Sequence, residues 1–146
     1  MSRFGTVLPD SLFSNKHSIL ARVLDHYRSG DMTIAQAARP SIPVPKEIAS
    51  LVSVMRETFH PTEIWLFGSR AKGTARSDSD WDLLAVLDDN AGADLSDPIL
   101  AWSVSRESGV PSTVLTTSRR DLEEIWGLPN TLGYDLSREG VRLLVG

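Results

Sequence analysis

Apolar and polar residues alternate along the chain in blocks typical of helices packed on a sheet. Two short, continuous apolar runs, Ile64–Phe67 and Leu83–Leu87, have the length and composition of buried strands. Val110–Thr117 and Val141–Val145 are two further strand candidates. Between and before these runs, apolar residues recur at intervals of three and four, which predicts amphipathic helices. These helices span residues 46–59, 96–108, 119–126 and 131–139.

The order of these elements, α-β-β-α-β-α-α-β, predicts an α+β domain with a small mixed sheet and helices packed on it. Ser96 and Ser118 precede two of the helices, and their side chains are suitable N-caps. In the helix over 96–108 we expect Ile99, Trp102 and Val104 to lie in the core.

The pattern over residues 1–44 predicts a helical extension that precedes a domain over residues 45–146. A helix is expected from about residue 10 to 28, and a shorter one over Met32–Ala38. The shorter helix could be half of a DNA-binding helix-turn-helix, but no basic recognition helix follows it, so a packing helix is favoured. The extension is a candidate dimerisation or partner arm. The stiff linker behind it carries Pro40, Pro43 and Pro45.

Composition excludes several classes of protein. The chain has 146 residues, enough for one domain with a substantial core. Its net charge of −4 disfavours a general nucleic-acid binder, which needs a basic face. The absence of Cys excludes disulfides and thiolate zinc sites. No apolar stretch is long enough for a membrane span, and the N-terminus lacks a signal-peptide core, so a cytoplasmic protein is expected.

Candidate chemistry is concentrated between the two central strands. Gly68 has no Cβ, so it can turn the chain sharply and let a ligand approach the backbone. A short helix starting after Ser69 would present free N–H groups to an anion, and the serine hydroxyl would add a donor. The loop that follows is basic and carries Arg70, Lys72, Gly73 and Arg76.

Three carboxylates, Asp78, Asp80 and Asp82, alternate just before the second strand. Residues two apart on a strand point to the same side, so Asp80 and Asp82 aim their carboxylates together. Trp81 points the other way and is expected to pack in the core rather than to stack on a base. Oxygen ligands of this kind suit Mg²⁺. The pattern predicts a nucleoside triphosphate carrying Mg²⁺ between the turn and the carboxylates.

Two simpler interpretations of the acidic stretch are disfavoured. A solvated hairpin loop would not place Asp82 directly before five apolar residues, where an unpaired charge is costly. A calcium loop would share the spacing of Asp78, Asp80 and Asp82. It also requires Gly at the sixth position and Glu at the twelfth, where this chain has Leu83 and Asp89.

The motif Gly68-Ser69, ten residues, Asp80-Trp81-Asp82 resembles the signature of the minimal nucleotidyltransferases, small members of the DNA polymerase beta superfamily. A second stretch, Leu132–Gly140 followed by Val141–Val145, is similar to the closing helix and last strand of that family. The resemblance covers roughly residues 45–146 and implies a polymerase-beta-like α+β fold.

The resemblance also implies an activity. The chain would transfer a nucleoside monophosphate from a nucleoside triphosphate, ATP in the first place, to a hydroxyl acceptor with release of pyrophosphate. Acceptors in such families include a tyrosine of a protein partner, an RNA end or a small molecule such as an aminoglycoside. Many minimal members resemble antitoxins that modify a cognate helical, HEPN-type ribonuclease toxin. A partner protein or a second subunit, as in a homo-oligomer, would complete so small a site.

By the same resemblance, individual residues take roles. Gly68 and Ser69 would hold the β- and γ-phosphates. Asp80 and Asp82 would bind Mg²⁺ beside the α-phosphate and act as the catalytic pair. The cations of the loop are either phosphate contacts or solvated charges, and the two candidates are Arg70 and Lys72.

The sequence departs from the family at one position. A third carboxylate usually stands on the following strand and can take the proton of the attacking hydroxyl. In this chain, alignment puts Ser112 or Thr113 there, and Val110–Thr117 contains no acid. A hydroxyl replaces neither a metal-binding carboxylate nor a base. Asp121 and Glu107 are the nearest substitutes outside the strand. The alternative to an enzyme is therefore a nucleotidyltransferase-fold binding module that docks or neutralises a protein partner.

Overall fold

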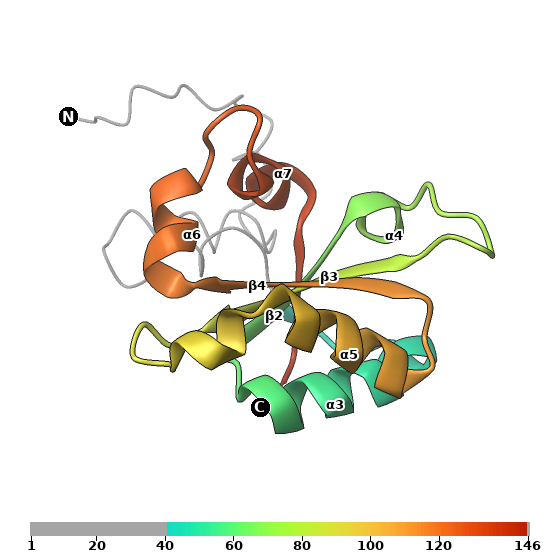
Figure 1. Ribbon diagram of the computed structural model, residues 1–146. Helices are drawn as coiled ribbons and strands as arrows, with labels where there is room; N and C mark the ends of the chain where they lie inside the picture. Colours follow the sequence, from blue (N-terminus) through green and yellow to red (C-terminus); the bar gives the residue numbers. More distant parts are fainter. Residues whose placement is uncertain (1–40, 146) are drawn as a thin grey trace, which may run out of the picture.

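In the computed structural model, which describes residues 41–145, a five-stranded sheet lies between two layers of helices (Figure 1). The strand order is β1-β5-β2-β3-β4. β2 runs antiparallel to both β3 and β5, whereas the outer pairs β3–β4 and β1–β5 are parallel. The predicted small mixed sheet is therefore confirmed. The strands are β1 Ser41–Ile42, β2 Glu63–Phe67, β3 Trp81–Leu87, β4 Ser112–Ser118 and β5 Val141–Leu143.

The helices also follow the predicted order, but the one expected over 96–108 begins later than predicted. The carboxylate of Asp97, not the hydroxyl of Ser96, caps the helix that begins at Pro98, and it accepts a hydrogen bond of 2.8 Å from the amide of Ile99. A residue before proline avoids helical geometry, so Asp97 is extended and the helix starts at the next residue, Pro98. The helical elements are η2 Lys46–Ile48, α3 Ala49–Phe59, α4 Gly68–Lys72, η3 Ala93–Ser96, α5 Pro98–Ser108, α6 Arg119–Ile125 and α7 Leu132–Glu139.

Both faces of the sheet are buried, which explains why its central strands are continuous apolar runs. Side chains alternate between the faces along each strand. On one face, strand residues pack with α3 and α5, and on the other they pack with α6 and α7 (Figure 1). The first face includes Ile64, Leu66, Leu83, Ala85 and Val114. The second includes Trp65, Leu84 and Val86 with Leu122 and Leu136.

The prediction that Ile99 and Trp102 belong to the core is wrong. Their side chains are 72% and 59% exposed, whereas Val104 is buried as expected. The inner stripe of α5 is formed by Ala101 and Val104 together with Ser105, whose hydroxyl donates to the carbonyl oxygen of β4's first residue at 2.9 Å. Because a polar serine points inward, the apolar pattern alone selected the wrong side of this helix.

A buried carboxylate ties together the end of the sheet away from α4. Glu63 is only 7% exposed. It accepts hydrogen bonds from Trp65 Nε1 at 3.2 Å and from Arg142 Nη1 at 3.1 Å, and Arg119 Nη2 lies 3.5 Å from it. Arg142 also donates to Ser41 Oγ at 2.9 Å. One acidic side chain therefore links β1, β2, β5 and the start of α6.

The predicted extension over residues 1–44 falls mostly outside the described residues, as do its helices over 10–28 and 32–38. Its last residues form β1, which pairs with β5. Within the described range, no helix combines the length and apolar composition needed to cross a bilayer.

Glu63→Ala should lower the free energy of unfolding by about 3 kcal/mol, because it removes a buried carboxylate and leaves two partly buried arginines without their partner. Urea denaturation measures this change. Glu139→Ala is the control, since it removes a half-exposed ion pair of 3.8 Å with Lys72 and should cost less than about 1 kcal/mol. Equal losses of unfolding free energy in the two variants would show that the Glu63 network stabilises the fold no more than an exposed ion pair.

Candidate functional site

The site begins where β2 turns into α4. Phe67 ends the strand in extended geometry, and Gly68 follows with a φ of 70° as the first residue of the helix. The sequence placed this start after Ser69, so the helix begins earlier than expected. The first amides of a helix have no partner within it, and no side chain caps α4. Amide donors therefore stand at this turn without a capping acceptor.

The carboxylate of Asp82 lies directly against the backbone of Gly68. Asp82 pairs with Phe67 across the antiparallel β2–β3 ladder, which brings its side chain to the turn. A Cβ added to Gly68 would overlap Oδ2 of Asp82 and lie 3.1 Å from its Cγ. Glycine is required here twice, by its backbone angle and by this close approach. A turn with uncapped backbone amides and a carboxylate thus meet at one point.

Asp80 and Asp82 form the carboxylate pair. Asp82 lies on β3 and is half-buried, whereas Asp80 precedes the strand and is exposed. Burial raises the pKa of the Asp82 carboxyl, and the negative charge of Asp80 raises it further. A hydrogen bond with the side chain of Thr113 acts in the opposite direction and lowers that pKa. A cation beside the pair would favour ionised Asp82.

The parallel register of β3 and β4 identifies the residue at the third position. Thr113 pairs with Asp82, and its side chain contacts that carboxylate. Ser112 pairs with Trp81 and turns toward α5, where its hydroxyl lies 2.6 Å from that of Ser105. Of the two residues left open by the sequence, Thr113 therefore faces the site. The signal that separates them is the strand register, which local sequence does not contain.

The oxygen donors suit Mg²⁺ held partly by phosphate. Among residues 41–145, neither Asp121 nor Glu107 joins Asp80 and Asp82 in a group of three acidic, histidine or cysteine side chains that could hold a metal ion. Mg²⁺ in phosphoryl-transfer sites typically has one or two carboxylates, with substrate phosphates and water as its other ligands. The raised pKa of Asp82 fits the same role, since a divalent cation would offset the repulsion within the pair.

Arg70 shapes the loop that leads to the carboxylates. Its Nη2 donates to the carbonyl oxygen of Ser79 at 2.8 Å, and its guanidinium carbon lies 4.5 Å from the centre of the Trp81 ring. The loop is closed by a bond of 2.8 Å from the amide of Arg76 to Ser79 Oγ. Trp81 itself packs against the α3 side of the core, as expected. Arg70 thus holds the backbone directly before Asp80.

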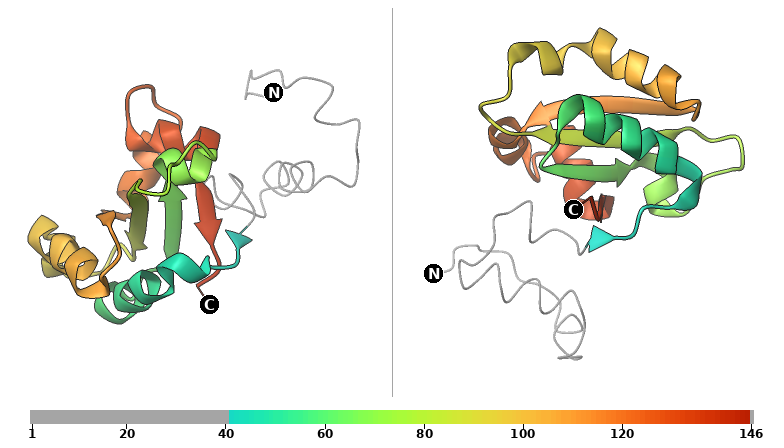
Figure 2. Two further views of the ribbon diagram at one scale, coloured as in Figure 1. Left: turned by 90° about the vertical axis from the view of Figure 1, so that its right-hand side faces the viewer. Right: turned by 90° about the horizontal axis from the view of Figure 1, so that it is seen from below.

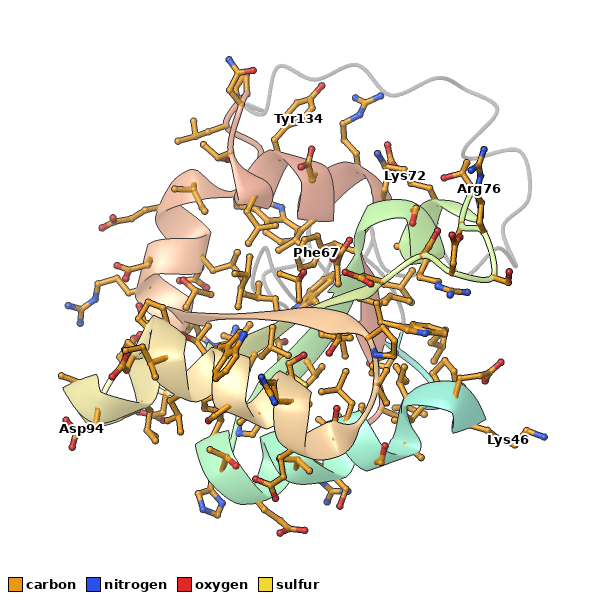
Figure 3. All side chains as sticks on the ribbon, turned by 45° about the vertical axis from the view of Figure 1, so that its right-hand side comes forward. Lys46, Phe67, Lys72, Arg76, Asp94 and Tyr134 are labelled. Carbon is orange, nitrogen blue, oxygen red and sulfur yellow. The ribbon has the colours of Figure 1, made fainter. Side chains whose placement is uncertain are left out.

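Lys72 is the more accessible cation of the site. Its Nζ lies 3.8 Å from Glu139 Oε2 on α7, and both side chains are nearly half exposed. Exposed pairs of this kind contribute little, so the ammonium group can turn toward an anion at small cost. Figure 3 shows Lys72 and Arg76 on the α4 side, with Tyr134 on neighbouring α7.

Comparisons with known proteins identify a family that includes this part of the chain. The family model described as nucleotidyltransferase domain matches residues 48–136, which include the turn and both carboxylates. A solved structure, "Crystal structure of the toxin-antitoxin with AMP-PNP", is 18% identical to this chain with a TM-score of 0.46. The likeness covers 70% of this chain and 75% of that chain. None of the curated proteins compared matches the chain.

Gly68→Ala should destabilise the protein more than Gly73→Ala. Both glycines have positive φ, 70° and 78°, so each alanine costs about 1–2 kcal/mol in backbone strain. A Cβ at Gly73 meets nothing within 4 Å, whereas one at Gly68 displaces Asp82 and adds about 1–3 kcal/mol. Urea unfolding of the two variants measures the difference. Equal losses would show that the Asp82 carboxylate does not constrain Gly68.

Asp80→Asn should lower the pKa of the Asp82 carboxyl without restoring its ordinary value, because burial is the larger cause of the shift. An acid whose pKa is raised by folding makes stability fall as pH rises through the window above about 3.9. The substitution should therefore reduce that fall. Carboxyl NMR titration checks the pKa, with Asp78→Asn as an exposed control. Equal shifts in both variants would contradict a specific Asp80–Asp82 interaction.

Proposed function

The chain belongs to the nucleotidyltransferase domain family, and from this membership we propose that it transfers a nucleoside monophosphate to a hydroxyl acceptor. The donor is a nucleoside triphosphate carrying Mg²⁺, with ATP as the first candidate. Pyrophosphate is the second product.

One observation supports this proposal above the others, namely the contact between the Asp82 carboxylate and the Gly68 backbone. Backbone amides at the turn attract phosphate oxygens, and a carboxylate attracts a divalent cation. Their contact suits a ligand in which phosphate and cation are already joined. A metal–triphosphate complex is such a ligand.

Each residue of the site then has a task. Gly68 and Ser69 bind the β- and γ-phosphates through their amides and the serine hydroxyl, and Lys72 adds positive charge. Asp80 and Asp82 hold Mg²⁺, which neutralises phosphate charge when it is bound. Nη2 of Arg70 already donates to the loop carbonyl of Ser79, so we assign this residue the roles of supplying positive charge and fixing the loop rather than contacting phosphate directly.

In the reaction, the acceptor oxygen forms a bond to the α-phosphorus. The bond between that phosphorus and the oxygen bridging to the β-phosphate breaks, and the electron pair leaves with pyrophosphate. The hydroxyl proton passes to water, because Thr113 stands where the family has its base and a threonine hydroxyl is not basic. General-base help is typically worth about 10²–10⁴-fold, so slow transfer is expected.

The same threonine favours a second candidate function. A chain that binds metal and nucleotide without a base could act as a binding module, with the nucleotide fixing the conformation that docks or neutralises a protein partner. Under either function, a partner protein is the natural acceptor or target. A helical ribonuclease toxin is the first candidate for that partner.

Thr113→Asp should accelerate the transfer by about 10²–10⁴-fold, because it adds a base and a metal ligand beside Asp82. The assay follows label from α-phosphate-labelled ATP, and pyrophosphate release, with Mg²⁺. Its acceptors are tyrosine peptides, a short RNA with a free 3′ end and an aminoglycoside. Asp82→Asn should abolish turnover.

Ser112→Asp is the matched control, since Ser112 faces α5 and an acid there cannot reach the site. Circular dichroism verifies that each variant is folded. Turnover that is absent in both the native chain and Thr113→Asp would overturn the transferase proposal and favour the binding module.

A further inference from the structure

β4 forms an outer edge of the sheet and is open to pairing. It pairs with β3 on one side, and no other strand within residues 41–145 pairs with it (Figure 2). An edge strand leaves backbone N–H and C=O groups free on its outer side, and natural proteins usually protect such edges with charges, proline or a bulge. Ser112–Ser118 contains neither a charged residue nor a proline. This edge is therefore a template for another extended chain.

A groove of about 320 Å³ runs along the same edge, between α5 and β4. Its walls include Trp102 and Pro98 of α5 and the consecutive residues 112–116 of β4, and no wall residue is charged. Trp102 is 59% exposed, and the guanidinium carbon of Arg106 lies 4.8 Å from the centre of its ring. Next to it Ile99 is 72% exposed, and Leu115 on the strand is 40% exposed. Large exposed apolar side chains thus lie near the free edge of β4.

The groove adjoins the candidate active site through one shared residue, Thr113. Thr113 is one of its wall residues, and the same side chain contacts the Asp82 carboxylate. The next residue on that face, Leu115, pairs with Leu84 of β3. A chain added to the free edge of β4 would lie two strand spacings, about 10 Å, from β3, so a long side chain such as tyrosine could extend past Thr113 toward Asp82. This continuity connects the groove with the reaction and distinguishes it from an isolated apolar patch.

We propose that β4 and the groove beneath Trp102 dock an extended segment of a partner protein, and that this segment carries the acceptor hydroxyl. This inference rests on the proposed function and specifies its acceptor. The segment adds a strand to the sheet, so its backbone supplies hydrogen bonds and alternate side chains supply specificity. An uncharged, apolar groove suits a polypeptide, whereas an RNA end would need cations for its phosphates.

The faces of β4 specify the pattern of the docked segment. Ser112 and Val114 face α5, whereas Thr113 and Leu115 face the side of Asp82. Side chains of an added strand alternate in the same way. An apolar anchor beside Trp102 and a hydroxyl beside Asp82 therefore point to opposite faces. If the anchor is residue i of the docked segment, the residue with the hydroxyl must therefore be i±1 or i±3.

Binding of designed peptides to the full chain tests this proposal. The probes are fluorescein-labelled octapeptides with blocked ends, and each carries one leucine and one tyrosine among alanine and glutamine residues. The residue numbers of the leucine and the tyrosine differ by one, two, three or four, and this difference is called the spacing. Fluorescence anisotropy with Mg²⁺ and ATP should give at least tenfold tighter binding for spacings of one and three than for two and four. Trp102→Ala and Leu115→Lys should each weaken this binding at least tenfold.

Leu144→Lys is the matched control, because Leu144 is 56% exposed next to β5 and should not affect peptide binding. Equal affinity at odd and even spacings, no binding at millimolar peptide, or unchanged binding in Trp102→Ala and Leu115→Lys would overturn the proposal. So would a native dimer that Leu115→Lys dissociates in sedimentation, since a second copy would then occupy the edge. Tighter binding of a short RNA through Trp102 would also overturn it.

Label transfer to the peptides separates this proposal from the proposed function. Spacing-dependent binding that requires Trp102 but gives no labelled tyrosine would support docking and contradict the transferase. Transfer that proceeds equally well in Trp102→Ala and Leu115→Lys would support the transferase and contradict docking on this edge.

Discussion

The contact between the Asp82 carboxylate and the Gly68 backbone is the constraint on which the site depends. It requires a glycine with positive φ, and it requires the β2–β3 register that pairs Phe67 with Asp82. A slip of one residue would exchange the side chains that β3 presents to the two buried layers, which differ in size and are closely packed, and it would turn Asp82 to the face opposite the Gly68 turn. The core and the candidate chemistry are thus determined by the same alignment of two strands.

The carboxylate pair is held in an arrangement that is unfavourable without a cation. Asp82 is partly removed from water and faces the charge of Asp80, and both effects raise its pKa. The rest of the structure supports this arrangement. Arg70 fixes the loop before Asp80, and the Glu63 network joins the strands at the other end of the sheet. Repulsion that a divalent ion would relieve is typical of sites prepared for a metal-bound ligand.

The sequence predicted what local pattern determines. The turn at Gly68, the alternation of Asp80 and Asp82 and the inward position of Trp81 all follow from residues close together in the chain. The sequence could not decide whether Thr113 or Ser112 faces Asp82, because this depends on the register with a strand about thirty residues away. The outward face of α5 was also missed, since Ser105 occupies an inward position that the pattern assigns to an apolar residue. Long-range register and inward polar side chains therefore set the limit of the sequence analysis.

The central claim is that the Gly68 turn and the carboxylate pair bind one Mg²⁺–nucleoside triphosphate. Isothermal titration calorimetry of ATP into the full chain, with Mg²⁺ and with EDTA, tests it most directly. The account predicts micromolar binding that needs Mg²⁺ and disappears when Asp80 and Asp82 are both replaced by asparagine. Absence of binding at millimolar ATP, or binding that persists without the metal or the carboxylates, would contradict it.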